Sequence, residues 1–128
     1  MDLKLTQSME DYLEVIHLLK LDQGNVRVKD IAEKMEITMP SVSSAIRNLE
    51  KYGLVCHPRY DLVLLTSKGI QIAEGVYRRH LVIRNFLSQV LGLDADVAER
   101  DACGMEHIIS TETFDSLVRF MNEKNRKE

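Results

Sequence analysis

Apolar residues recur every three or four positions along most of this chain, which is the period of an amphipathic helix. The first run begins after Ser8, which we expect to cap a helix, and ends at Gly24. Its apolar positions are Tyr12, Leu13, Ile16 and Leu19. The same run carries two carboxylates, Asp11 and Glu14, which stand three residues apart and therefore share one helix face.

The next two runs predict a helix-turn-helix motif. A short helix from Val28 to Met35 is followed, after a few residues, by a helix that Thr38 caps. This second helix carries Pro40 in its first turn, where a missing backbone N–H is tolerated, and Gly53 supplies its C-terminal stop. Two short helices joined in this way, the second starting with small polar side chains, match the helix-turn-helix pattern.

Polar side chains of this second helix indicate DNA as a ligand. Four of them lie off its apolar stripe and can reach base edges or phosphates: Ser41, Ser43, Ser44 and Arg47. Two β-prone runs over residues 54–57 and 62–65 then predict a hairpin with Arg59 at its tip, where it suits a phosphate or minor-groove contact. A hairpin directly after the recognition helix makes the unit a winged helix-turn-helix.

Three more helices are expected after the hairpin. The first is capped by Thr66 and continues to about Leu91, which gives a length of roughly 37 Å. The other two are capped by Asp94 and Ser110. Because these segments are rich in Leu, Val, Ile and Phe, they can also form a helix-pair surface for a partner subunit.

A candidate metal site lies within the same segments. Cys103, Glu106 and His107 stand at i, i+3 and i+4, so a helix would place their side chains on one face. A thiol, a carboxylate and an imidazole together suit a divalent transition metal. His80 lies on the preceding helical stretch, which a short turn can fold back against this one. A plainer interpretation stays open, since a helical Cys is more often a small buried hydrophobe.

Composition narrows the class of protein. The 128 residues are 45% hydrophobic and 29% charged, and no apolar run approaches the roughly 20 residues of a membrane span. The N-terminus lacks a hydrophobic signal core, so we expect a cytoplasmic protein with no membrane partner. In that compartment Cys56 and Cys103 indicate thiols or metal ligands rather than a disulfide. The net charge is −3, yet residues 38–68 carry +2, a weak indication of DNA.

Five motifs, in this order, resemble the metal-dependent repressors of the diphtheria toxin repressor family, most closely its shorter manganese transport regulator branch. They are Ser-Met-Glu-Asp-Tyr-Leu-Glu (8–14), Asp-Ile-Ala-Glu (30–33), Leu-Thr-Ser-Lys-Gly (65–69), Tyr-Arg-Arg-His (77–80) and Glu-His (106–107). The resemblance covers nearly the whole chain. It implies a mainly α fold, with a winged helix-turn-helix DNA-binding domain over residues 1–70 and a helical dimerisation and metal-binding domain over residues 71–128.

The resemblance also implies a single metal site drawn from three helices. Its ligands would be Asp11, Glu14, His80, Cys103, Glu106 and His107. Manganese regulators of this type carry glutamate at the position of Cys103, whereas iron-responsive relatives carry cysteine there. The iron-responsive relatives, conversely, carry methionine at the position of Asp11. The set is therefore a hybrid, which implies Mn(II) or Fe(II) as the metal. A second family site pairs His80 with an acid one turn later, but that position is Arg84. Glu99 occupies the place of another ligand of that site, so it either binds metal or, as we expect, forms an ion pair with Arg84.

These features predict a metal-dependent transcriptional repressor that binds a DNA operator as a homodimer, controls metal-uptake genes and needs no organic cofactor. One alternative is a winged-helix regulator that senses an organic ligand or thiol oxidation through Cys103. The other is a small metal-dependent hydrolase that uses the same cluster. Because the sequence shows no separate general base and no substrate-pocket signature, we expect that the protein is not an enzyme.

Overall fold

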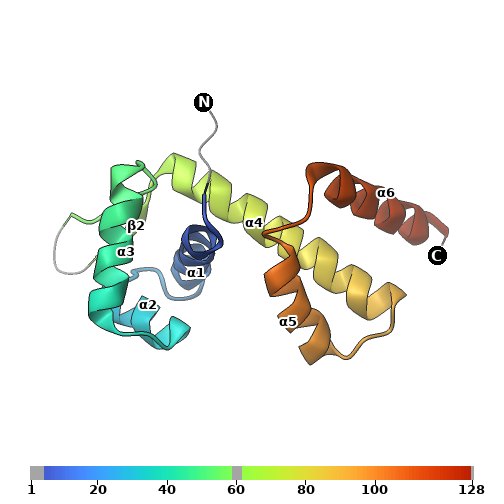
Figure 1. Ribbon diagram of the computed structural model, residues 1–128, viewed down its shortest axis with the longest axis horizontal. Coiled ribbons are helices and arrows are strands. Elements are labelled where there is room, and N and C mark those ends of the chain that lie inside the picture. Colours follow the sequence, from blue (N-terminus) through green and yellow to red (C-terminus); the bar gives the residue numbers. More distant parts are fainter. Residues whose placement is uncertain (1–4, 59–61, 128) are drawn as a thin grey trace. The chain divides into compact units, whose positions relative to one another are not determined.

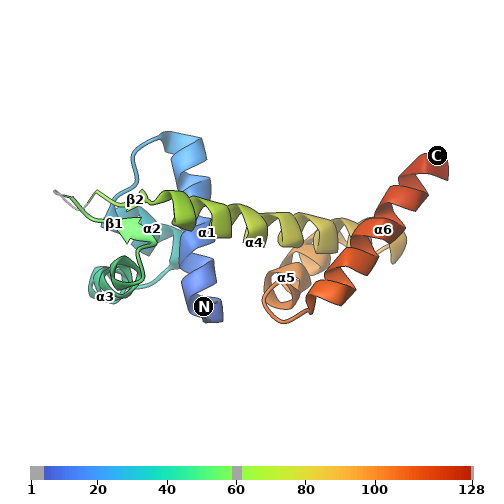
Figure 2. The ribbon, with the colours of Figure 1, turned by 90° about the horizontal axis from the view of Figure 1, so that it is seen from above.

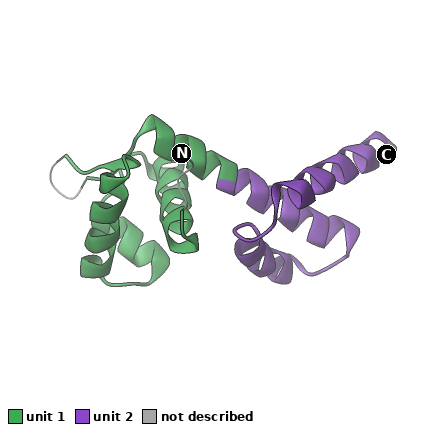
Figure 3. Ribbon diagram, turned by 45° about the horizontal axis from the view of Figure 1, so that its top comes forward, with its two compact units in different colours: residues 1–75 green, residues 76–128 purple. Residues whose placement is uncertain are grey.

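The computed structural model describes residues 5–58 and 62–127, and these are mainly helical (Figure 1). The elements in chain order are α1 (Gln7–Gln23), α2 (Val28–Met35), α3 (Met39–Lys51), β1 (Val55–Cys56), β2 (Leu64–Leu65), α4 (Ser67–Asn85), the π-helix η1 (Phe86–Val90), α5 (Ala95–Met105) and α6 (Thr111–Lys127). The chain divides into two compact units, residues 1–75 and 76–128, which we call the N-terminal and C-terminal units (Figure 3). None of the described helices is both long enough and apolar enough to cross a membrane.

The N-terminal unit begins with α1, whose start differs from the prediction. Thr6, not Ser8, is the N-cap: its hydroxyl oxygen accepts a hydrogen bond from the backbone N–H of Met9 at 3.1 Å. Thr6 and Ser8 are both good caps, and because Thr6 lies two positions earlier, the helix is about half a turn longer than predicted. The predicted end is confirmed, because Gly24 closes α1 with φ of 88°, a conformation that favours glycine.

The helix-turn-helix is confirmed by α2 and α3. Helix α2 has the predicted bounds, and Glu36 ends it in the left-handed conformation with φ of 57°. Thr38 then caps α3 by accepting from the backbone N–H of Ser41 at 3.3 Å, and Pro40 lies in the first turn as expected. The fully buried side chains of α3 are Val42, Ile46 and Leu49, so its opposite face is left for a ligand.

A two-stranded antiparallel wing follows α3. Val55 pairs with Leu65, and Cys56 pairs with Leu64, so each strand is shorter than the predicted run (Figure 2). The wing is joined to the loop before α2 by a hydrogen bond from the N–H of Val63 to the carbonyl of Val26 at 2.8 Å. The predicted tip with Arg59 lies outside the described residues.

Helix α4 starts directly after the wing and packs closely against its base. Thr66 caps it as predicted, accepting from the N–H of Gly69 at 3.1 Å. The backbone N–H of Thr66 donates in turn to the carbonyl of Leu54 at 3.1 Å. A Cβ atom at Gly69 would clash with that same carbonyl, so only glycine fits at this position.

The C-terminal unit holds the rest of α4, together with η1, α5 and α6. Its buried core consists of Ile83, Leu87, Ala98 and Ala102. The helix predicted to continue to Leu91 does so, but its last turn widens into η1, where the N–H of Leu91 reaches the carbonyl of Phe86 at 3.3 Å. Ser110 caps α6 as expected by accepting from the N–H of Thr113 at 3.1 Å.

Candidate metal centre

His80 is the centre of a polar cluster inside the C-terminal unit. Its side chain is only 5% exposed, and each of its nitrogens faces a carboxylate. Nδ1 lies 2.9 Å from Oε2 of Glu106, and Nε2 lies 2.9 Å from Oε1 of Glu99. The ring of Tyr77, one turn earlier on α4, stacks beside it with centroids 6.4 Å apart. The imidazole is therefore fixed in orientation as well as in position.

Glu106 and His107 lie immediately after α5 and not within it, which corrects the prediction of one helix face. The helix ends at Met105, and Glu106 is its C-cap, with its N–H still donating to the carbonyl of Ala102 at 3.0 Å. The chain then turns, and the side chains of both residues are almost completely buried. Cys103 lies in the last turn of α5, and its Sγ is 3.8 Å from Nδ1 of His80.

The nitrogen, oxygen and sulfur atoms of this cluster are suitable ligands for a divalent transition metal. Oε1 of Glu106 is buried and makes no hydrogen bond within the described part of the chain, although Nε2 of His107 lies 3.3 Å away. A buried carboxylate oxygen is costly unless it is compensated, and a cation compensates it directly. Imidazole nitrogen, carboxylate oxygen and thiolate sulfur together are ligands of first-row divalent metals.

The surrounding carboxylates make His80 unusually basic. Its hydrogen bond with Glu106 is the main cause that raises the pKa of His80 to about 9; burial opposes the rise, and Glu99 adds to it. The imidazole therefore carries a proton at neutral pH in the metal-free protein. A metal ion would take the place of that proton.

The other two predicted ligands, Asp11 and Glu14, belong to the N-terminal unit. Both are half-buried and stand three residues apart on α1, so they share a helix face as expected. Within the C-terminal unit the structure brings together His80, Cys103, Glu106 and His107. The participation of the two α1 carboxylates is part of the function proposed below.

Glu99 plays a larger part in the cluster than the sequence indicated. The expected ion pair is present, with Nη1 of Arg84 3.7 Å from Oε2 of Glu99. The bond from the other oxygen of Glu99 to His80 was not predicted. The available signal was the resemblance, because Glu99 occupies the place of a ligand of the second family site, which also uses His80.

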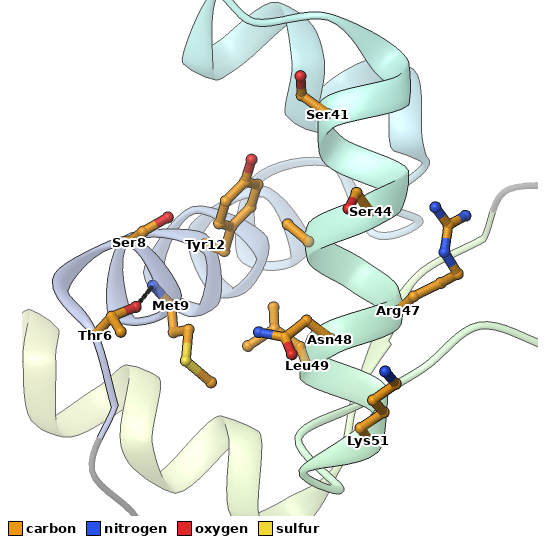
Figure 4. Close-up of a pocket in the computed structure, with 11 residues that line it drawn as sticks. Thr6, Ser8, Met9, Tyr12, Ser41, Ser44, Arg47, Asn48, Leu49 and Lys51 are labelled. Carbon is orange, nitrogen blue, oxygen red and sulfur yellow. Dashed lines mark hydrogen bonds between the residues drawn. The ribbon is translucent and has the colours of Figure 1, made fainter.

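Three of the five predicted DNA-contacting residues line a polar groove in the N-terminal unit. Ser41, Ser44 and Arg47 line this groove of about 510 Å³ between α3 and the start of α1 (Figure 4). All three are exposed, whereas Ser43 is half-buried and does not line the groove.

Two further polar residues of α3 that were not predicted, Asn48 and Lys51, also line the groove. Asn48 stands four residues after Ser44, and Lys51 stands three residues after Asn48, so both lie on the same face of α3 as Ser44. From α1, Thr6 and Ser8 close the other side. The groove thus offers several polar side chains and the two cations Arg47 and Lys51, together with apolar side chains such as Met9 and Leu49.

Both units match known family models. Residues 4–63 match the model described as iron dependent repressor, N-terminal DNA binding domain. Residues 66–127 match the one described as iron dependent repressor, metal binding and dimerisation domain. The chain belongs to the iron dependent repressor family. The resemblance to the diphtheria toxin repressor family and the mainly α, two-part fold predicted from the sequence are thereby confirmed.

Individual relatives agree with the assignment of the chain to this family. The chain is 35% identical over 125 residues to the HTH-type transcriptional regulator MntR of Shouchella clausii, covering 95% of this chain and 87% of that relative. It is 34% identical over 115 residues to the transcriptional regulator MntR of Salmonella typhimurium, covering 90% and 73%. None of these relatives supports the alternative of a thiol sensor, and by its family the repressor is a metal-dependent transcriptional regulator.

Solved structures of similar proteins share the fold of the repressor. The manganese regulator SloR superposes with a TM-score of 0.80 at 35% identity, covering 92% of this chain and 55% of that one. A manganese-dependent transcriptional repressor in complex with manganese gives 0.80 at 30% identity, covering 89% and 52%. The chain therefore spans about half the length of these two solved proteins.

Proposed function

We propose that the protein is a homodimeric repressor that binds its DNA operator when Mn(II) or Fe(II) is bound, and so controls metal-uptake genes in the cytoplasm. The observation that carries this is the buried cluster around Glu106. Its Oε2 bonds to His80 and its Oε1 faces His107 at 3.3 Å, inside the part of the chain that matches a metal-binding and dimerisation domain. The activity requires neither an organic cofactor nor catalysis.

The proposed site has six ligands from both units. Asp11 and Glu14 come from α1 of the DNA-binding unit, and His80, Cys103, Glu106 and His107 come from the C-terminal unit. When bound, a divalent ion would supply the positive charge that attracts the carboxylates of α1 together with the imidazoles and the thiolate of the C-terminal unit. The ligands thereby limit how freely the DNA-binding unit moves.

Restricting that freedom favours DNA binding in a dimer. Two recognition helices must meet half-sites that lie about 34 Å, or a multiple of it, apart. Units that are already ordered lose less entropy when they bind DNA. A coupling of about 1–3 kcal/mol between metal and DNA would change the affinity for DNA roughly 5–150-fold.

Helix α3 is the proposed reading element. Ser41, Ser44 and Arg47 are exposed on α3, where they would reach bases or phosphates (Figure 4), and Arg59, predicted at the tip of the hairpin, would add a further contact. Ser43 is the weakest member of the predicted set because it is half-buried. The small polar residues near the start of α3 suit entry into the major groove, where the N-terminal residues of a recognition helix contact base edges.

An apolar surface of the C-terminal unit supports the homodimer. Phe86, Val90, Leu117 and Phe120 line a groove of about 430 Å³, and Phe120 is 47% exposed. Covering these side chains in a partner subunit removes them from water, which is favourable at about 25 cal/mol per Å² of apolar surface.

The experiment uses the full chain and DNA selected from a random pool in the presence of manganese. Binding of that DNA is then measured by fluorescence anisotropy with Mn(II), with anaerobic Fe(II), with Zn(II) and with a chelator alone. We expect tight binding with manganese and iron and weak binding with the chelator. Equal binding with and without metal would overturn the proposed function.

A further inference from the structure

The start of α1 forms the side of the polar groove opposite α3, and the reading of DNA by α3 gives it no role (Figure 4). From α1 the groove is lined by Thr6, Ser8, Met9 and Tyr12. Tyr12 is only 7% exposed, and its hydroxyl makes no hydrogen bond within residues 5–58 and 62–127. Because a tyrosine hydroxyl withdrawn from water usually has a hydrogen-bond partner, the partner of this one is expected in the groove.

The hydroxyl of Tyr12 is a hydrogen-bond donor at every physiological pH. Burial raises the pKa of Tyr12 above its ordinary value of 10, so the phenol keeps its proton. Figure 4 shows the ring reaching out from α1, with the hydroxyl at its far end. The group therefore suits a ligand that accepts hydrogen bonds.

The N-terminus of α1 favours a ligand that is also negatively charged. The side-chain oxygen of Thr6 accepts from the N–H of Met9, and its carbonyl accepts from the N–H of Glu10, both at 3.1 Å. The helix itself supplies no acceptor for the N–H groups of Gln7 and Ser8. Such groups, with the partial positive charge of the helix end, attract anions. Glu10, the acid of the first turn, does not line the groove.

The rest of the lining points to the backbone of a nucleic acid as the source of the anion. Arg47 and Lys51 contribute two cations from α3. Met9 and Leu49 contribute apolar surface, which suits a sugar better than a free ion. A duplex whose major groove holds α3 also carries phosphates along both flanks of that helix, and the start of α1 lies along one flank.

We propose that the hydroxyl of Tyr12 and the N-terminus of α1 bind one backbone phosphate of the operator in each half-site, beside the bases that α3 reads. The site rests on the proposed function, in which α3 enters the major groove. A phosphate contact carries no sequence information, but it fixes the register and orientation of a protein on the duplex. Helix α1 is then a second DNA-binding element, next to α3.

Tyr12→Phe tests the hydroxyl, because the change removes one oxygen and no hydrogen bond within the described chain. With manganese present, anisotropy should show affinity for selected and random DNA reduced alike, by about tenfold or more, since a hydrogen bond to a charged group is lost. The salt dependence of binding should stay the same, because the phenol is uncharged. Tyr52→Phe, on an exposed tyrosine outside the groove, should bind as the parent does. Unchanged affinity in Tyr12→Phe, or a loss confined to selected DNA, would overturn the proposal.

Ser8→Asp tests the helix end, with Gln7→Asp as the matched control. A carboxylate at either position favours the N-terminus of α1, so both variants should fold. Only Ser8 lines the groove, and its neighbour Gln7 is exposed outside it. Repulsion of a bound phosphate should therefore weaken DNA binding at least about fivefold more in Ser8→Asp than in Gln7→Asp. Equal losses would exclude a phosphate at this helix end.

A scan of the selected DNA with single methylphosphonates, each of which removes one phosphate charge, locates the contact. At one position in each half-site the parent should lose affinity and Tyr12→Phe should lose much less. Identical profiles for the two proteins would overturn the proposal. The scan is repeated with the chelator alone: tight binding there would contradict metal control, as proposed above, whereas the difference between the two profiles tests the phosphate site in either condition.

Discussion

Glu106 Oε2 lies 2.9 Å from Nδ1 of His80, and both side chains are at most 5% exposed. The hydrogen bond to this carboxylate raises the pKa of His80 to about 9, which is why the imidazole keeps its proton at neutral pH. Metal-free protein is therefore held together at this point by a hydrogen-bonded ion pair. The proton of His80 must leave when a metal binds through that nitrogen.

The stability of the metal-free protein should fall as the pH rises above neutrality. The pKa of His80 is raised to about 9 in the folded state, above the 6.5 of a free histidine. Its contribution is thus complete below about pH 6.5 and is lost as the pH approaches about 9. Urea unfolding in chelator at pH 6 and pH 9 measures this. Glu106→Gln removes the main cause of the raised pKa and should show a smaller decrease; an equal decrease in both proteins would contradict the assignment.

His80→Ala should separate metal sensing from folding. The variant should remain a folded dimer, because apolar contacts such as those of Ile83 and Leu87 hold the C-terminal unit. Its binding to selected DNA should no longer respond to manganese, as measured by anisotropy. His17→Ala, on α1 and outside the ligand set, serves as the control and should respond normally. A normal manganese midpoint in His80→Ala would refute the six-ligand site.

Arg47→Ala should weaken binding to the selected DNA by about 1–3 kcal/mol if the guanidinium contacts a base. Metal affinity measured without DNA should be unchanged, because Arg47 lies on α3 in the groove and not in the metal cluster. Arg119→Ala removes the same charge from an exposed position on α6 and should have little effect. An equal loss of affinity for selected and for random DNA would indicate that Arg47 contacts a phosphate and not a base.

Cys103→Glu should shift metal preference toward manganese. The change replaces a soft sulfur by oxygen, so the response to Mn(II) should rise relative to Zn(II) and Co(II). Because a thiol must lose its proton to bind, the parent should also show a steeper pH dependence of metal affinity than the variant. Competitive titrations between about pH 6 and 8 measure both effects, below the ordinary thiol pKa of roughly 8.5. Identical rankings and slopes would mean that Cys103 only packs beside the site, and Cys56→Ser controls for general thiol effects.

Gly69→Ala should destabilise the N-terminal unit although it adds only one methyl group. The new Cβ would meet the carbonyl of Leu54, which is backbone and cannot rotate away. We expect the free energy of unfolding to fall by about 1–3 kcal/mol, as for other overpacked sites. Gly75→Ala, on the same helix with nothing within 4 Å of the added atom, should instead stabilise by about 0.5–1 kcal/mol. Chemical denaturation of the two variants would show the opposite signs.

The sequence predicted the helix-turn-helix well because its boundaries depend on local signals. Thr38, Pro40 and Gly53 each act within a few residues of their own position, and α3 begins and ends where they indicate. The start of α1 was wrong by two residues because Thr6 and Ser8 are both acceptable caps.

The metal cluster was predicted only in part, because its geometry depends on contacts between distant residues. The bond between His80 and Glu99 joins positions 19 residues apart, and no local pattern encodes it. The end of α5 at Met105 was also missed, since the next residues offer no proline or glycine to mark it. The spacing of Cys103, Glu106 and His107 was informative, but the turn after the helix determines how they meet.

That turn gives the backbone itself an electrostatic role. The C-terminal end of a helix carries a partial negative charge of about half an electron, which stabilises nearby cations by roughly 0.3–1 kcal/mol and more where it is partly buried. Glu106 is the C-cap of α5, so the aligned peptide dipoles of the helix end beside its carboxylate. Any divalent ion bound at the proposed site would experience this field to the same extent. The main chain would therefore add affinity without discriminating among metals, and the choice among them would depend on the side chains around it.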